Sequence, residues 1–167
     1  RYSRFNRLGG QFVTDYVNNQ PVIYNSELDI YEEGDASGET YYSKNESIAT
    51  FNNLEPRLGL AYQLNESSSI KASYTKSSQY MHLLSNTSAV TPVDVWTPSG
   101  KYIKPQLSNQ YALGYYKNFK NNMFSMELET YYKTIDNRID YVDGSDLIGT
   151  NTIETEILNG EARAYCV

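Results

Sequence analysis

The sequence has little of what most catalytic and metal sites require: its 167 residues include one cysteine, one histidine and one tryptophan. The single cysteine, Cys166, excludes an internal disulfide, and the single histidine, His82, has no cluster of metal-ligating residues around it in sequence. No nucleophile motif, glycine-rich phosphate loop or zinc motif is present. We therefore expect no cofactor, no metal site and no enzyme activity.

Long hydrophobic runs and excess positive charge are also missing. No stretch of about 18 apolar residues occurs, so the sequence predicts no transmembrane helix. The formal net charge is −6, and the basic residues are scattered while the acidic ones concentrate in residues 27–46. Nucleic-acid binding usually leaves a basic patch, so we expect no nucleic-acid partner. No leader segment is visible and Val167 carries no terminating signal, so we expect a fragment of a longer protein.

Tyrosine is abundant, with 17 residues, and it accompanies a strict alternation of apolar and polar side chains. This period of two is typical of strands with one apolar and one polar face. Two hairpins are predicted, with connections at residues 65–69 and 120–123. Their apolar positions are Leu58, Leu60, Tyr62, Leu64, Ile70, Ala72 and Tyr74, then Tyr111, Leu113, Tyr115, Phe124, Met126 and Leu128.

Strand register follows from these connections, because a slip by one residue would place the apolar sets on opposite faces. The first hairpin is predicted to pair Leu64 with Ile70, Tyr62 with Ala72 and Leu60 with Tyr74. The second is predicted to pair Phe119 with Phe124, Tyr115 with Leu128 and Tyr111 with Tyr132. The opposite face then carries Arg57, Gln63, Lys71, Ser73, Tyr116, Glu127 and Glu129.

The whole chain is predicted to be all-β, an antiparallel meander of about six strands. No helical period persists anywhere. The expected strands cover residues 1–5, 48–64 with an interruption near Asn52 and Asn53, 69–80, 107–119, 123–135 and 156–166. Long loops cover about 6–47, 76–105 and 136–155, and Val13 and residues 22–24 can form short strands within the first.

Short and long connections alternate strictly, which is the layout of a transmembrane β-barrel. The mean hydropathy of −0.60 is compatible with it, because half of every barrel strand faces a polar lumen. A soluble, aromatic-rich β-sandwich or propeller that binds carbohydrate satisfies the two-faced hairpins equally well, so this alternative stays open at this point.

Several segments resemble the barrel of TonB-dependent outer-membrane receptors, in the version found in bacteria of the Bacteroidetes type. The similarity covers most of residues 48–167, whereas residues 6–47 match only as a variable loop. The segments are Asn53–Leu60, Ile70–Tyr74, Gln79–Asn86, Pro92–Ser99, Lys104–Gln106, Tyr111–Tyr115 and Asn159–Tyr165. The sequence departs from the family pattern at Cys166, where a glycine is expected.

This resemblance implies that residues 1–167 are part of a 22-stranded barrel, with the plug domain and the remaining strands outside this chain. It implies location in the outer membrane, contact with membrane lipid, and energy from the TonB–ExbB–ExbD complex through a missing N-terminal part. The imported ligand would be an iron–siderophore complex, a vitamin or an oligosaccharide.

Candidate site residues lie in two groups. Tyr80, His82, Asp94 and Trp96 are candidates for ligand binding by the loops, since aromatic rings stack on sugars or planar ligands and a carboxylate orients hydroxyls; the alternative for Trp96 is a structural anchor at the rim. Residues expected to face the lumen are Arg57, Lys71, Tyr116, Glu127 and Glu129.

The lumen-facing carboxylates admit two interpretations. Glu127 and Glu129 could form a catalytic pair for glycoside hydrolysis, but we favour a lumen wall with salt bridges to the plug or to Lys and Arg across the sheet. Two smaller predictions concern the strands themselves. Pro56 should block pairing where a strand begins, and Lys117 should extend from the apolar face toward the head groups.

Overall fold

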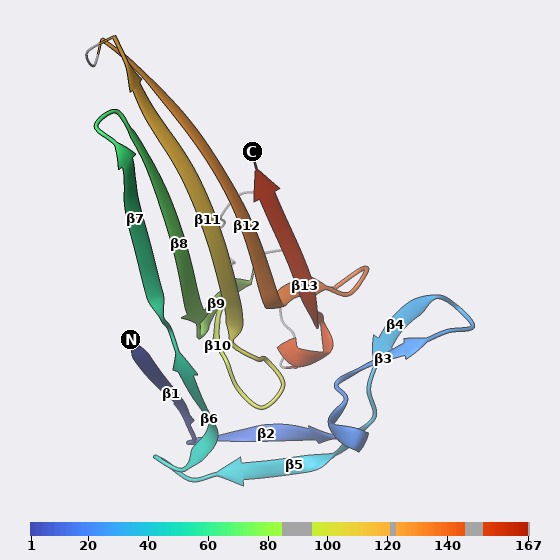
Figure 1. Ribbon diagram of the computed structural model, residues 1–167. Helices are drawn as coiled ribbons and strands as arrows, with labels where there is room; N and C mark the ends of the chain where they lie inside the picture. The colour runs from blue at the N-terminus through green and yellow to red at the C-terminus, as the bar shows by residue number, and fades with distance from the viewer. Residues whose placement is uncertain (85–94, 121–122, 146–151, 167) are drawn as a thin grey trace.

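The computed structural model describes residues 1–84, 95–120, 123–145 and 152–166 (Figure 1). Within these ranges the chain forms thirteen β-strands and two short 3-10 helices. No helix in the described part of the chain is long and apolar enough to cross a membrane. The all-β prediction is confirmed.

Five long strands form one antiparallel sheet in the order β13-β12-β11-β8-β7. The sheet is curved, and its short turns lie at the opposite end from its long connections (Figure 1). We call this five-stranded sheet the wall. Its strands are β7 Arg57–Asn65, β8 Ser68–Gln79, β11 Gln106–Phe119, β12 Phe124–Tyr141 and β13 Ile157–Cys166.

The second hairpin has the predicted register, with Tyr111 opposite Tyr132 and Phe119 opposite Phe124. The first hairpin does not, because Tyr62 lies opposite Ile70, two residues away from the predicted partner. An irregularity between Gln63 and Asn65 shortens the connection, and the Asn65 side chain accepts a hydrogen bond from the Ser67 amide at 3.0 Å. Since the error is an even number of residues, the apolar set still shares one face.

The predicted strand over residues 48–64 is interrupted, but at Glu55 and Pro56 rather than near Asn52 and Asn53. Its first half is β6 Ser47–Leu54, which pairs with β1 Tyr2–Leu8, while its second half is β7. Proline has no N–H to donate to the ladder, so the strand breaks there. The Pro56 carbonyl still accepts a hydrogen bond from the Lys76 amide at 3.0 Å.

The six predicted strands therefore correspond to β1, β6 with β7, β8, β11, β12 and β13, and the long loops add hairpins of their own. β12 continues to Tyr141, so the third loop begins later than predicted. The loop hairpins are β2 Gln11–Tyr16 with β5 Ala36–Tyr42, β3 Val22–Asn25 with β4 Ile30–Glu33, and β9 Met81–Leu84 with β10 Val95–Pro98. The 3-10 helices are η1 Val17–Asn19 and η2 Ile153–Thr155.

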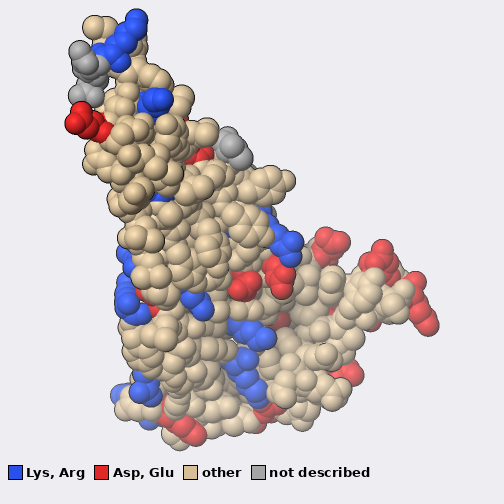
Figure 2. Space-filling view, in the orientation of Figure 1, with Lys and Arg blue, Asp and Glu red and all other residues tan. Residues whose placement is uncertain are grey.

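The apolar core of the described residues lies at the long-loop end of the wall. It consists of Leu84 of β9, Ile103 of the loop between β10 and β11, and Ile157 at the start of β13, with Ile139 and Ile153 packed against them. Acidic atoms gather on the β3–β4 hairpin, which projects from the rest of the chain (Figure 2). This placement agrees with the concentration of acidic residues that the sequence shows in the first loop.

Candidate functional site

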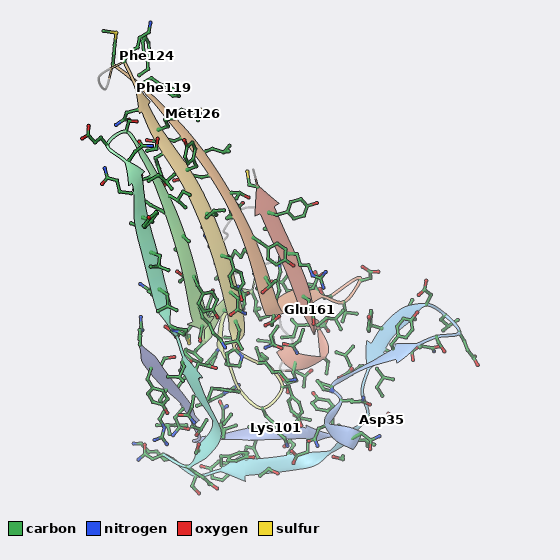
Figure 3. All side chains as sticks on the ribbon, viewed as in Figure 1. Asp35, Lys101, Phe119, Phe124, Met126 and Glu161 are labelled. Carbon is green, nitrogen blue, oxygen red and sulfur yellow. The ribbon has the colours of Figure 1, made fainter. Side chains whose placement is uncertain are left out.

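One face of the wall is apolar and uncovered. Leu60 on the edge strand β7 is 77% exposed, and Leu113 on the central strand β11 is 52% exposed although β11 pairs on both sides. Phe119, Phe124 and Met126 continue this face to the short-turn end (Figure 3). An uncovered patch of this length marks a surface that meets an apolar environment.

A row of aromatic rings crosses this apolar face. Leu58 lies opposite Tyr74 in the ladder, and the row continues sideways through Tyr111, Tyr132 and Tyr165. The Tyr74 and Tyr111 rings stack with centroids 4.9 Å apart. Tyrosine suits a boundary between hydrocarbon and water, because its ring is apolar and its hydroxyl is polar.

At the other end of this face, Lys117 extends toward the short turn, as predicted. Its ammonium lies 5.1 Å from the centroid of the Phe119 ring. The cation therefore lies against an aromatic ring of the apolar face, and its extension to the head groups stays a prediction.

The opposite face of the wall carries the charged residues. Lys71 lies 4.3 Å from the centroid of the Tyr116 ring, and the Tyr116 hydroxyl donates a hydrogen bond to Glu129. The ladder places Arg57 and Glu127 on this same face. The seven residues predicted to share a polar face therefore share one, and they include the five that were expected to face the lumen.

The carboxylates of this face are not held as expected. Neither Glu127 nor Glu129 takes part in a salt bridge among the described residues. Tyr116 stands between Lys71 and Glu129 instead, and links them through its ring and its hydroxyl. Across the sheet, a cation–π contact and a hydrogen bond therefore stand where a salt bridge was expected, and salt bridges from these carboxylates to the plug stay a prediction.

A shallow depression of about 450 Å³ lies beside this Lys71–Tyr116–Glu129 chain. Small side chains line it, and Gly114 is one reason for its shape. A Cβ at Gly114 would come within 2.9 Å of the Tyr116 ring, so only glycine lets the ring lie flat there. The other small lining residues are Gly59, Ala61, Ser73 and Ala112.

The long-loop end of the molecule holds a second polar assembly, which joins three loops. Lys101 forms an ion pair with Asp15 on β2, and Figure 3 shows Lys101 at this end, near β2. The Tyr16 ring meets the Tyr102 ring edge-on at 5.3 Å, and the Tyr16 hydroxyl donates to Glu154 at 3.5 Å. We call these five residues the loop joint.

Electrostatics within the loop joint follow from these contacts. The hydrogen bond from Lys101, assisted by one from Thr40, lowers the pKa of Asp15, and the same pair raises the pKa of Lys101. Burial, with the nearby Glu154 carboxylate, raises the pKa of the Tyr16 hydroxyl. Both members of the ion pair are therefore charged, and Tyr16 is neutral, throughout the ordinary pH range.

A polar pocket of about 150 Å³ adjoins the loop joint. Its walls include Arg7 of β1, which lies within electrostatic reach of Glu154, together with Gln11 and Thr14 of β2. Lys101, Tyr102 and Glu154 belong both to this pocket and to the loop joint. Two positive groups, a carboxylate and a phenol can together bind a small polar group.

Of the predicted loop residues, His82 is buried and Tyr80 is half-buried, and both contact neighbouring side chains. His82 is 3% exposed, its Nε2 lies 3.0 Å from the Ser99 hydroxyl, and burial lowers its pKa. Tyr80 stacks on Phe5 at 5.1 Å and its hydroxyl lies 2.8 Å from the Ser3 hydroxyl. Both side chains support the loop from within.

Trp96 differs, because it is 64% exposed on β10. Its ring is exposed to a ligand in the described structure, and both ligand binding and the alternative of an anchor at the rim stay predictions for this residue. Asp94 lies outside the described residues. Sequence reasoning missed the loop joint altogether, because its members come from three loops and no local pattern connects them.

Comparison with known families gives one match. The model of the family described as TonB dependent receptor-like, beta-barrel matches residues 1–165. Neither the curated proteins nor the solved structures yielded a match. Together with the two-faced wall and the alternation of short turns and long loops, this match shows that the chain belongs to the TonB-dependent receptor β-barrel family, whose members are transport receptors of the outer membrane.

Proposed function

We propose that this chain forms part of the wall and mouth of an outer-membrane receptor that imports a scarce ligand with energy from the TonB–ExbB–ExbD complex. The observation that carries the proposal is the two-faced wall: its exposed apolar side suits membrane lipid, and its charged side suits an aqueous lumen. On this assignment Arg57, Lys71, Tyr116, Glu127 and Glu129 face the lumen.

The long-loop end is then the extracellular mouth, because short turns lie on the periplasmic side of such barrels. Trp96 is open to solvent there, and the polar pocket beside the loop joint offers charged and hydroxyl groups. A ligand with both planar and polar parts, such as an iron–siderophore complex, a vitamin or an oligosaccharide, suits this combination. The plug and the segment that contacts TonB belong to the rest of the full-length protein.

The assignment of the two faces is tested by spin labelling the full-length protein in lipid vesicles, with Cys166→Ser as background. Labels at Leu60, Leu113 and Met126 should be accessible to dissolved oxygen and protected from a water-soluble nickel chelate. Labels at Ser73, Gln110 and Glu127 should show the reverse preference. Equal access of the nickel chelate to both sets would refute a membrane-facing wall and favour a soluble β-sandwich or propeller.

Import itself is tested with labelled probes. Cells that produce the full-length receptor should accumulate one of a ferric siderophore, cobalamin or a maltooligosaccharide, and a protonophore should abolish the accumulation. Failure of all three, with the receptor folded in the membrane, would count against import of these ligand classes.

A further inference from the structure

An arginine with unused hydrogen-bond donors lines the polar pocket beside the loop joint. Arg7 lies near the end of β1 and is half-buried. Its side chain forms neither a salt bridge nor a hydrogen bond with another residue in the described part of the chain. A guanidinium carries several N–H donors in a planar fork. Arg7 can therefore donate hydrogen bonds to a group that enters the pocket.

The charge of Arg7 is incompletely compensated by the protein. Burial lowers the pKa of its guanidinium, and the negative charge of Glu154 opposes this effect without cancelling it. Both side chains line the pocket, but among the described residues they do not approach closely enough to form a salt bridge. Because an arginine keeps its proton at every ordinary pH, its charge is stabilised by any polar group that takes its hydrogen bonds.

The backbone fixes the place of Arg7. The pairing of β1 with β6 shifts register directly after this residue, and an irregularity of this kind re-aims a side chain. The chain then turns at the Gly9–Gly10 corner, whose amides donate to the carbonyl oxygens of Glu46 and Tyr42, each at 2.8 Å. The corner thus holds Arg7 of β1 and the first residues of β2 against the same pocket.

The loop between β10 and β11 has no side chain where it passes Arg7. A Cβ at Gly100 would collide with a terminal nitrogen of the guanidinium and would lie 3.0 Å from Cδ. Gly100 is buried, and its amide donates to the carbonyl oxygen of Ile103 at 2.8 Å. The position of the guanidinium therefore depends on glycine at residue 100.

The remaining charges at the pocket favour a neutral ligand group. Lys101 lines the pocket, but its charge is already taken up by the ion pair with Asp15. The hydrogen bond that Glu154 accepts from Tyr16 is long, at 3.5 Å. Two neighbouring hydroxyls satisfy both open groups, because one accepts from Arg7 while the other donates to Glu154. An anion would match Arg7 alone and would be repelled by the carboxylate.

Exposed aromatic rings border the same pocket. Phe12 lines it, and the Phe12 ring lies 4.9 Å from the Tyr41 ring, with the two residues 65% and 55% exposed. The uncharged polar residues of the lining are Gln11, Thr14 and Tyr102. Aromatic surface beside hydroxyl and amide groups suits a sugar ring, which has apolar faces and a polar edge.

We propose that this pocket is a subsite for a neutral sugar ring, in which Arg7 donates to one hydroxyl of the sugar and Glu154 accepts from its neighbour. The inference rests on the proposed function and narrows the imported ligand to an oligosaccharide. The subsite lies at the mouth, since Lys101 of its lining is at the long-loop end near β2 (Figure 3).

The test is equilibrium binding to the full-length receptor in lipid vesicles. The neutral probes are maltooligosaccharides, cellooligosaccharides, mannooligosaccharides and xylooligosaccharides, and ferric citrate is the anionic probe. At least one neutral probe should bind, and Arg7→Ala should weaken it roughly ten- to hundredfold, because hydrogen bonds from a charged group are lost. The matched control is Arg4→Ala, which removes an exposed arginine from the same strand and should leave the affinity unchanged.

Two further variants separate the geometry of the guanidinium from its charge. Gly100→Ala keeps every charge but displaces the guanidinium, and Arg7→Lys keeps the positive charge but not the planar fork. Both should weaken the sugar, and its affinity should be the same at low and high salt because the sugar is uncharged. Thermal unfolding in the same vesicles shows that each variant is folded.

Three results would overturn the subsite. The first is that no neutral probe binds, and the second is a sugar affinity that survives both Arg7→Ala and Gly100→Ala. The third is that ferric citrate binds instead, with full affinity in Arg7→Lys and a steep loss at high salt, which is the behaviour of an anion site.

Binding and import are separable. Sugar binding that depends on Arg7 supports the subsite even if no probe accumulates in cells. Conversely, energy-dependent import of a ferric siderophore or cobalamin by a receptor that binds no sugar supports the proposed function and overturns the subsite.

Discussion

The wall and the long-loop end differ in how far their apolar side chains are buried. At the loop end Leu84 is 1% exposed and Ile157 is 4% exposed, so ordinary apolar packing stabilises this region from within. In the wall Leu60 and Leu113 stay exposed although their strands are regularly paired. On the proposed function, this difference means that the wall depends on lipid on one side and on the rest of the receptor on the other, whereas the long-loop end has an apolar core of its own.

The strongest test of this contrast removes buried volume at the loop end. Ile157→Ala should lower the stability of that region by about 2–5 kcal/mol, because a cavity replaces packed methyl groups. Hydrogen exchange on the full-length protein should show faster exchange in β9 and η2, with the β7–β8 hairpin unaffected. The control is Ile23→Ala on the exposed β3. Equal acceleration throughout the wall would contradict a separate core at the mouth.

The next test places a charge on each face of the wall. Leu113→Arg should lower the free energy of unfolding by about 2–4 kcal/mol in a bilayer, because an arginine on the lipid face is poorly solvated. Gln110→Arg, on the opposite face of the same strand, should change it by no more than about 0.5 kcal/mol. Denaturant unfolding of the full-length protein in vesicles measures both. Similar losses from the two variants would mean that both faces meet the same medium.

Acid and base should both weaken the ion pair between Lys101 and Asp15 at the long-loop end. The Lys101 hydrogen bond holds the pKa of Asp15 below its ordinary 3.8, so the pair contributes fully above that value and is lost as pH falls through the lowered pKa. The same hydrogen bond from Lys101 to Asp15 raises the pKa of Lys101 above 10.5, so the contribution is full below that value and is lost as pH rises through the raised pKa.

Hydrogen exchange of the β2–β5 ribbon in the full-length protein should therefore stay constant, after correction for the intrinsic pH dependence, from about pH 5 to pH 9 and accelerate outside that window. Asp15→Asn should remove the change at the acid side. A change near neutral pH would show that another group controls the attachment of β2 to the loop that carries Lys101.

The smallest effect on stability is expected at Trp96. Because its ring is exposed on β10, Trp96→Ala should change the unfolding free energy by about 0.5 kcal/mol or less. If Trp96 contacts the ligand, the affinity for whichever probe is imported should still fall, whereas Met81→Ala on the paired strand β9 should leave it unchanged. Loss of stability without loss of affinity would return Trp96 to the role of an anchor.

Local pattern was sufficient to predict the wall. The period of two fixed which side chains share a face, and the connection at residues 120–123 fixed the pairing of Tyr111 with Tyr132. It was insufficient at residues 65–69, where the Asn65 side chain and the irregularity beside Gln63 shorten the turn. The alternation of apolar and polar residues does not predict side-chain hydrogen bonds of that kind.

The mouth was beyond local reasoning. Asp15 and Lys101 are 86 residues apart, and Tyr16 and Glu154 are 138 apart. Nothing in the sequence near either residue selects the other, because the pairing depends on where the Gly9–Gly10 corner directs the first loop. His82 illustrates the converse: its chemistry suggested a ligand contact, and nothing in the local sequence indicated that it would be buried beside Ser99.

The row from Leu58 through Tyr74, Tyr111, Tyr132 and Tyr165 runs perpendicular to the strands, and this direction has a geometric consequence. Neighbouring strands lie about 4.8 Å apart and barrel strands tilt by about 40°, so each step sideways also moves a ring by roughly 3 Å along the bilayer normal. On the proposed membrane location, each tyrosine of the row therefore lies at a different depth from its neighbour on the next strand. The difference in depth between neighbouring rings would then measure the tilt of the strands relative to the bilayer normal.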